Sequence, residues 1–325
     1  MSKQIVSIAK GDEYWSTMKS LELIKDQIVK KLHHKKPKEI FLKPNWLKYR
    51  PDWLPITKLD TLRATIDFFN QLGRYDFVVG DGVSMVWGWT SKEFLSKTNY
   101  YDLEKEYKNV RVIDLNDYSA EKKFEALTID GKKEVRYYKP ILDAQFLVSI
   151  AKIKTHDTWA NTLSLKNVAV GCAHWQDKVL FHGFSKPHDP RQGMPDLKRW
   201  YEKTLPLANR NLYLASKIVY PDLAIIDGVL AMEGEGPSKG TPVALGITLS
   251  GCDPLSADIV ATKIMGFVLE EIPYLDILND VMKPDIEIIG EDISQFDYRF
   301  KTDKEYKKYR YGIKKDKVLE LLIRF

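Results

Sequence analysis

The sequence predicts an α/β fold of two closely joined α/β lobes with mainly parallel sheets and a small β-hairpin insertion. Short β-rich segments alternate with amphipathic helical segments in the first third of the chain, and the alternation returns near residue 196. Strands that alternate with helices are typical of parallel βαβ units. A length of 325 residues, 44% of them hydrophobic, allows a large core. We treat residues 1–325 as one unit, with 1–143 and 144–325 as its lobes.

The first third of the chain shows the alternation most clearly. Leu21, Ile24 and Ile28 recur at helical spacing, and Gly73 follows a second segment of the same kind as a helix stop. The predicted strands span 4–9, 39–42 and 77–79, and the predicted helices span 16–32 and 59–72.

The middle and last thirds contain a hairpin, a covered strand and a return to α/β character. Asp130-Gly131 is a turn pair between two strand-like runs, which predicts the hairpin. The apolar run 144–150 is typical of a strand covered on both faces, whereas polar residues 152–195 resemble functional loops. The remaining predictions are strands at 110–115, 124–129, 134–138, 222–226, 242–249 and 286–289 and helices at 196–217, 258–264 and 272–282.

Composition excludes several classes of protein. Only Cys172 and Cys252 are present, so the chain cannot form a disulfide framework, a four-thiolate zinc site or an iron–sulfur cluster from its own cysteines. No long apolar run or secretory signal is visible, which predicts a cytoplasmic protein without a membrane span. Net charge is +5, and acidic residues dilute the basic, tyrosine-rich run 301–317, so a solvated surface is favoured over nucleic-acid binding.

Histidines cluster in the polar middle of the chain. His156, His174, His182 and His188 fall within 33 positions, although the chain has only six histidines. Imidazole exchanges protons near neutral pH and is also the commonest metal ligand. We predict His156 and His182 as catalytic acid/base or metal-contacting groups, with His174 and His182 as metal ligands. Because no histidine pair has the H-E-x-x-H spacing, a metal site built from protein ligands alone is the weaker alternative.

Lys166 is the third predicted catalytic residue. It lies in a mostly apolar run, where a lysine withdrawn from water has a lowered pKa and can serve as base, nucleophile or covalent anchor. The equal alternative is a surface lysine whose stem covers apolar neighbours.

Polar residues follow four predicted strands, and open α/β sheets bind ligands where their strands end. Lysines, hydroxyls and amides at that edge suit a carboxylate or phosphate, while carboxylates among glycines suit proton or cation binding. Turns and helix caps would explain many of the same residues. The predicted ligand-binding residues are Lys43, Asn45, Asp81, Ser84, Lys152, Lys154, Thr158, Thr162, Asn167, Asp227, Glu233 and Glu235.

These motifs, taken in order, resemble the DUF362 family, an uncharacterised group. The resemblance runs over roughly residues 5–296. Many members of that family also contain ferredoxin-like cysteine segments, which imply a redox partner protein, but this chain lacks them. The motifs are Lys43-Pro44-Asn45, Gly80-Asp81-Gly82, Lys152 to His156 with Thr162 to Asn167 and Gly171, Asp227-Gly228 to Gly240, and Asp253-Pro254 to Asp258.

A fainter similarity is to the nickel-pincer lactate racemases. His156, Lys166 and His182 follow one another at 10 and 16 residues, which resembles the catalytic histidine, cofactor-tethering lysine and nickel-binding histidine of those enzymes. The resemblance implies a transition metal or a nickel-pincer cofactor. This chain departs from it in residues 162–167 and in Ser84, which stands where a catalytic histidine is expected.

The sequence therefore predicts an enzyme that acts on a small carboxylated or phosphorylated metabolite by proton transfer in an inter-lobe cleft. An isomerase or racemase, or a lyase, fits this chemistry. The alternatives are a protein that binds a ligand, metal or cofactor without turnover, and a redox-associated accessory protein. The loops 43–45, 80–84, 152–167, 174–188 and 227–240 are expected to converge on the cleft.

Overall fold

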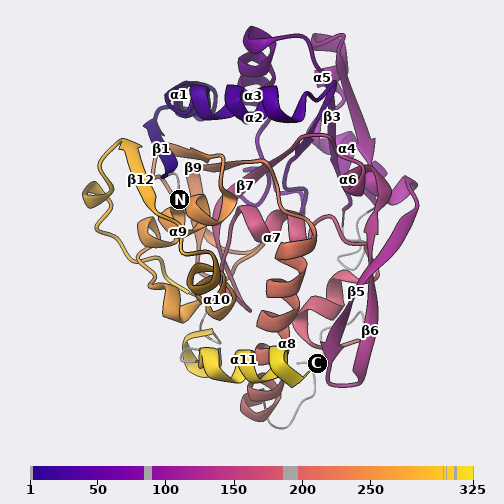
Figure 1. The fold of residues 1–325 in the computed structure, drawn as a ribbon, viewed down its shortest axis with the longest axis vertical. Helices are drawn as coiled ribbons and strands as arrows, with labels where there is room; N and C mark the ends of the chain where they lie inside the picture. Colours follow the sequence, from indigo (N-terminus) through magenta and orange to yellow (C-terminus); the bar gives the residue numbers. More distant parts are fainter. Residues whose placement is uncertain are drawn as a thin grey trace.

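The computed structural model describes residues 3–83, 90–185, 197–302, 304, 306–310 and 313–324. Within this part of the chain, a ten-stranded sheet forms the centre of the molecule (Figure 1). Its order is β12-β1-β11-β9-β7-β2-β3-β4, while β8 pairs with β7 and β10 with β9. The strands are β1 (Gln4–Lys10), β2 (Glu39–Lys43), β3 (Asp76–Asp81), β4 (Val110–Asp114), β7 (Leu147–His156), β8 (Ala160–Thr162), β9 (Leu223–Glu233), β10 (Thr241–Val243), β11 (Ile247–Gly251) and β12 (Ile286–Gly290).

Most pairs along the sheet are parallel. Strands β9, β7, β2, β3 and β4 run in one direction, and β1 pairs in parallel with β12. Strand β11 is antiparallel to both of its neighbours. A separate antiparallel hairpin joins β5 (Ala120–Thr128) to β6 (Gly131–Tyr138). The predicted α/β class, with a mainly parallel sheet and a hairpin insertion, is confirmed.

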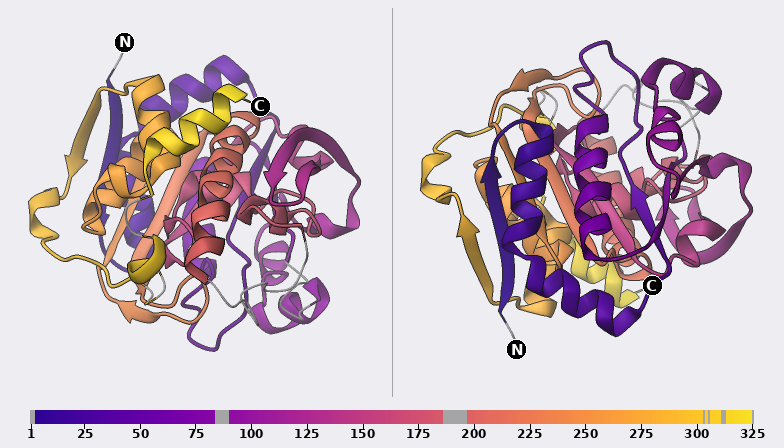
Figure 2. Two further views of the ribbon diagram at one scale, coloured as in Figure 1. Left: turned by 90° about the horizontal axis from the view of Figure 1, so that it is seen from below. Right: turned by 90° about the horizontal axis from the view of Figure 1, so that it is seen from above.

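Helices cover both faces of the sheet (Figure 2). One face carries α1 (Glu13–Leu23), α2 (Lys25–Lys35) and α3 (Leu59–Leu72), and the other carries α7 (Ser164–Ala169), α8 (Leu197–Ile218), α9 (Pro254–Ile264), α10 (Pro273–Met282) and α11 (Lys315–Arg324). Each helical layer encloses its own apolar cluster against the sheet. Because both faces are covered, every residue of β7 is buried.

Short elements complete the described structure. They are α4 (Ser91–Thr98), α5 (Asp102–Glu106), α6 (Lys139–Leu142), the 3₁₀ turns Leu115–Asp117, Lys178–His182, Leu269–Glu271 and Ile293–Gln295, and a π-helical turn at Tyr306–Arg310.

Several element boundaries differ from the sequence prediction. The helix expected at 16–32 is two helices that meet at Ile24, where φ is −111° and ψ is 18°. Residues 152–156, expected to be loop, continue β7, and β9 continues to Glu233, because ion pairs and hydrogen bonds compensate their polar side chains. The strand expected at 242–249 is divided into β10 and β11 around Gly246, whose φ of +66° suits glycine.

Both predicted lobes contribute strands to the same sheet. Strand β1, from residues 1–143, lies between β11 and β12, from residues 144–325. Strand β2 likewise pairs with β7 across the expected boundary. The division into two lobes stays a prediction. The polar side chains described next lie at an edge of the sheet to which both halves contribute strands.

Candidate functional site

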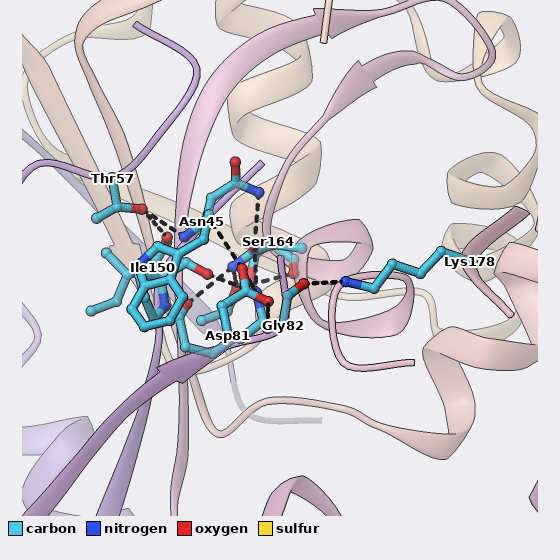
Figure 3. A network of polar contacts seen from close by, with 12 residues as sticks. Asn45, Thr57, Asp81, Gly82, Ile150, Ser164 and Lys178 are labelled. Atoms are coloured by element: carbon cyan, nitrogen blue, oxygen red, sulfur yellow. Dashed lines mark hydrogen bonds and ion pairs between the residues drawn. The ribbon is translucent and has the colours of Figure 1, made fainter. Parts of the chain in front are cut away.

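Strand ends bring a buried ion pair to one edge of the sheet. Because β2 and β3 are parallel neighbours, Lys43 and Asp81 end at the same side of the sheet, and Lys43 Nζ lies 2.8 Å from Asp81 Oδ2. The carboxylate also accepts hydrogen bonds from the backbone N–H groups of Trp46 and Gly82 at 2.8 and 2.7 Å (Figure 3). Several charge-assisted bonds thus offset the desolvation of this pair.

Two asparagine amides connect the lysines around this pair. Asn45 Nδ2 donates to Asn167 Oδ1 at 3.0 Å, and that oxygen also accepts from Lys43 Nζ at 3.2 Å. Lys154 Nζ donates to Asn45 Oδ1 at 2.6 Å and to Pro55 O at 2.7 Å. Burial, strengthened by neighbouring lysine charges, holds the pKa of Lys154 well below its ordinary value. These contacts make the two amides the framework that spaces the lysines.

A second buried ion pair lies beside this network. Lys152 Nζ is 2.9 Å from Asp227 Oδ2, and both side chains are almost completely shielded from water. Asp227 Oδ1 accepts from the backbone N–H of Val229 at 3.0 Å. Neither charged residue lines the pocket described next. Their contacts therefore support a role in joining β7 to β9.

A small pocket opens where β2 and β3 end beside α7. Its volume is about 70 Å³, far below the roughly 300–1,000 Å³ typical of pockets that enclose a drug-sized ligand. Lys178 Nζ donates to the carbonyl of Gly82 at 2.6 Å (Figure 3). The described lining residues are Asn45, Trp46, Leu47, Asp81, Gly82, Thr162, Lys166, Asn167, Val170, Gly171 and Lys178. Since Asp81 is already paired with Lys43, the lining has an excess of positive charge.

Lys166 lines the pocket, and its pKa is lowered. Burial lowers its pKa to about 7, the charge of Asp157 opposes that shift, and the charges of Lys178 and Lys43 add to it. Its Nζ lies 5.0 Å from the ring centroid of Trp159. At neutral pH the amine is therefore divided between its charged and neutral forms.

A buried aspartate from a distant helix holds α7 in place. Asp258 Oδ1 and Oδ2 accept the backbone N–H groups of Ser164 and Leu165 at 2.8 and 2.9 Å, although 94 residues separate Asp258 from Ser164. Burial raises the pKa of Asp258 to about 8 in spite of these two bonds. The helix that carries Lys166 and Asn167 is thus capped by another element of the fold.

Both predicted catalytic histidines pack against Trp159. The ring centroids of His156 and His182 lie 4.9 and 4.7 Å from that of Trp159, and 5.8 Å from each other. With Lys166 on the same tryptophan, the three predicted catalytic side chains share one aromatic neighbour. Burial, followed by the charge of Lys166, holds the pKa of His156 well below its ordinary value, so its ring is neutral at pH 7.

A chain of polar contacts joins the two histidines. His156 Nδ1 lies 3.0 Å from Asp157 Oδ1, Thr158 Oγ1 donates to the same oxygen at 3.0 Å, and Thr158 Oγ1 lies 3.1 Å from His182 Nδ1. The backbone N–H of Thr158 also points at His156 Nδ1 at 3.0 Å. The Thr158 N–H can donate only to an unprotonated Nδ1, whereas the Asp157 carboxylate can accept only from a protonated one. The tautomer or charge state of His156 therefore decides which of the two hydrogen bonds forms.

The predicted site residues His156, His174, His182, Glu233 and Glu235 are not among the residues that line the pocket. His174 Nδ1 is 3.0 Å from an Arg136 Nη, and no group of three or more histidine, cysteine or acidic side chains in the described ranges can hold a metal ion. Glu233 accepts from Tyr298 Oη and from the backbone N–H of Lys301, both at 2.8 Å, which fixes the C-terminal segment. Glu235 is exposed, and Ser84 and His188 lie outside the described residues.

Sequence reasoning missed Asp157, Trp159, Lys178 and Asp258 as members of the site. The first two adjoin the predicted His156 and Thr158, so proximity in sequence was an available signal. Lys178 lies in a segment without periodicity, and its contact with Gly82 spans 96 residues. Asp258 lies on α9 but caps α7, which begins 94 residues earlier in the chain, whereas Asp253 caps α9 itself.

Fold and site together define an α/β protein with a lysine-lined pocket at the carboxyl edge of a parallel sheet. Residues 40–263 match the family described as a domain of unknown function, DUF362. The match covers more than half of the chain, and the protein belongs to that family. This agrees with the resemblance found in the sequence motifs.

Three known proteins are similar to this chain. A thylakoid-associated protein of Synechocystis sp. is 25% identical over 237 residues, which cover 73% of this chain and 65% of that protein. The lactate racemase apoprotein of Thermoanaerobacterium thermosaccharolyticum has a similar fold, with a TM-score of 0.50 and 14% identity over 80% of this chain and 57% of that one. A Thermotoga maritima structure gives a TM-score of 0.40 and 13% identity over 74% and 57%.

The chain thus spans less than two thirds of each of these proteins. The racemase likeness shows a shared fold. Although one relative is associated with thylakoids, no described helix of this chain is long and apolar enough to cross a membrane.

Proposed function

We propose that this protein is an enzyme that binds a small carboxylated or phosphorylated metabolite in the lysine-lined pocket and transfers a proton to or from it. The observation that carries the proposal is the chain of contacts from His156 through Asp157 and Thr158 to His182, beside the tryptophan that Lys166 contacts. General acid–base catalysis needs groups of this kind within reach of the ligand.

Each group has a role that follows from its surroundings. Lys178, and Lys166 in its charged form, attract the anionic group of the ligand. Neutral His156 serves as a base, and the carboxylate and hydroxyl between the rings offer a path by which a proton passes to His182. The fold shared with a lactate racemase makes 2-hydroxy acids the first compounds to test.

The test is hydrogen exchange at carbon, followed by NMR. The enzyme is incubated in D₂O with L-lactate, D-lactate or L-malate, and deuterium at C2 is measured. We expect exchange with at least one acid, and a loss of about 10²–10⁴-fold in His156→Gln and His182→Gln. His34→Gln is the matched control, because His34 is exposed on α2. Binding of these acids without any exchange would instead support a binding protein.

A cofactor-holding protein is the second candidate. Lys166 makes no hydrogen bond or ion pair with a described residue, and His182 packs on the same tryptophan, so a lysine-tethered nickel cofactor would be held by these two residues. When bound, it would supply a Lewis-acidic metal. Elemental analysis and native mass spectrometry of protein purified without chelator test this candidate. Stoichiometric nickel, or added mass on Lys166, would support it.

A further inference from the structure

Two lysines of the pocket have N–H donors that no described residue accepts from. Lys178 Nζ donates one hydrogen bond, to Gly82 O, and Lys166 Nζ donates none to a described residue. Neither amine lies within 4.0 Å of a described carboxylate, in contrast to Lys43 and Lys152. Asn45 and Asn167, which line the same pocket, already use their amides on each other and on lysines. The groups left to contact a ligand are therefore mainly the two amines.

The two amines are suited to different tasks. Lys178 is fixed by the Gly82 carbonyl and keeps donors for an anionic group. Lys166 faces an aromatic ring, and its pKa of about 7 leaves a large share of neutral amine at physiological pH. A neutral lysine beside a second cation is a nucleophile toward carbonyl carbon. A carbonyl group and a negative charge on one ligand would engage both amines.

We propose that the pocket binds a small carbonyl compound that carries an anionic group, with Lys178 holding the anion and Lys166 forming an imine with the carbonyl carbon. This proposal rests on the proposed function and adds the class of substrate to it. The pocket volume of about 70 Å³ suits a compound of the size of a short 2-oxo acid better than a nucleotide.

The step balances without an oxidant or a reductant. The lone pair of Lys166 Nζ adds to the carbonyl carbon, both amine hydrogens leave with the carbonyl oxygen as water, and a C=N bond replaces C=O. Thr162 lines the same pocket, and a threonine hydroxyl can donate a hydrogen bond to that oxygen. A protonated imine withdraws electrons and acidifies hydrogen on the adjacent carbon, which gives His156 and His182 a proton to move.

Reductive trapping tests the imine. The full-length protein is incubated with pyruvate and sodium cyanoborohydride, and adducts are located by intact-mass and peptide mass spectrometry. We expect one reduced adduct on Lys166, formed about tenfold faster at pH 8 than at pH 6, because an amine with a pKa near 7 loses its proton across that range. Lys166→Arg should give no adduct at this site. Lys263→Met, which changes an exposed lysine on α9, should label like the parent.

Lys178→Met separates anion binding from imine formation. This variant should slow labelling by pyruvate about tenfold or more, but change labelling by acetaldehyde, which lacks an anionic group, by less than about twofold. If Lys166→Arg is labelled as fast as the parent, through surface lysines, the imine at Lys166 is overturned. Added mass on Lys166 in the protein as purified would overturn it as well. If pyruvate protects Lys166 from acetaldehyde without being trapped, the imine fails and the anion pocket stands. If pyruvate neither protects nor labels and the 2-hydroxy acids show no exchange, the proposed function fails too.

Discussion

Two groups of lysines lie at the same edge of the sheet, and they differ in what their amines contact. Lys43 and Lys152 each pair with a buried aspartate, at 2.8 and 2.9 Å. Lys166 and Lys178 line the pocket without a described carboxylate within 4.0 Å. A paired buried charge is costly to break, whereas an unpaired one shifts its pKa and is a candidate for chemistry. We therefore expect changes at Lys43 and Lys152 to affect mainly stability, and changes at Lys166 and Lys178 to affect mainly ligand binding and turnover.

Asp227→Ala should give the largest loss of stability. It leaves the ammonium of Lys152 buried without its partner, which costs about 3–5 kcal/mol of unfolding free energy. Urea unfolding at pH 7 measures the loss. The double variant Lys152→Met/Asp227→Leu is the control, because it removes both charges and should recover most of the stability. A loss below about 1 kcal/mol in the single variant would mean that the pair does not hold β7 to β9.

Gly171→Ala tests the close packing of the pocket wall against the paired lysine Lys43. An added Cβ would lie 2.1 Å from Asn167 O and 2.8 Å from Lys43 Nζ, so α7 or the lysine must move. We expect a loss of about 1–3 kcal/mol, as for an overpacked core, measured by urea unfolding. Gly251→Ala is the matched control, since its Cβ would meet no atom closer than 3.4 Å. Equal losses in the two variants would show that the pocket wall adapts.

Asp258→Asn should change stability less, and its effect should depend on pH. The variant replaces one carboxyl oxygen that accepts from α7 by an N–H donor, at a cost of about 1–2 kcal/mol. Because the folded pKa of Asp258 is raised to about 8, its contribution is fully present below about pH 4 and is lost as pH rises to about 8. Urea unfolding from pH 5 to 8 should show the advantage of the parent over Asp258→Asn shrinking. A constant difference would contradict the raised pKa.

The sequence allowed the fold to be predicted further than the site. Helix α3 was predicted to its exact bounds, Leu59–Leu72, because an amphipathic face and a terminal glycine are local signals. Residues 152–156 were placed in a loop because polarity suggests exposure, and the partners that bury them lie far away in sequence. Lys178 gave no signal, since only folding brings it to Gly82. Local patterns thus identify elements and strand ends, whereas the pairing of charges depends on the assembled fold.

Lys166→Met should cost the least stability and should not destabilise the protein at pH 7, because it removes an amine that makes no hydrogen bond or ion pair with a described residue and whose buried charge is unfavourable. Burial lowers the pKa of Lys166 to about 7 in the folded state, so the cost of its charge is complete below pH 7 and is relieved as pH rises toward about 10. The parent should therefore gain stability relative to Lys166→Met between pH 7 and about 10, measured by urea unfolding. A destabilisation comparable to that of Asp227→Ala would instead place Lys166 among the structural lysines and remove the distinction on which the proposed chemistry depends.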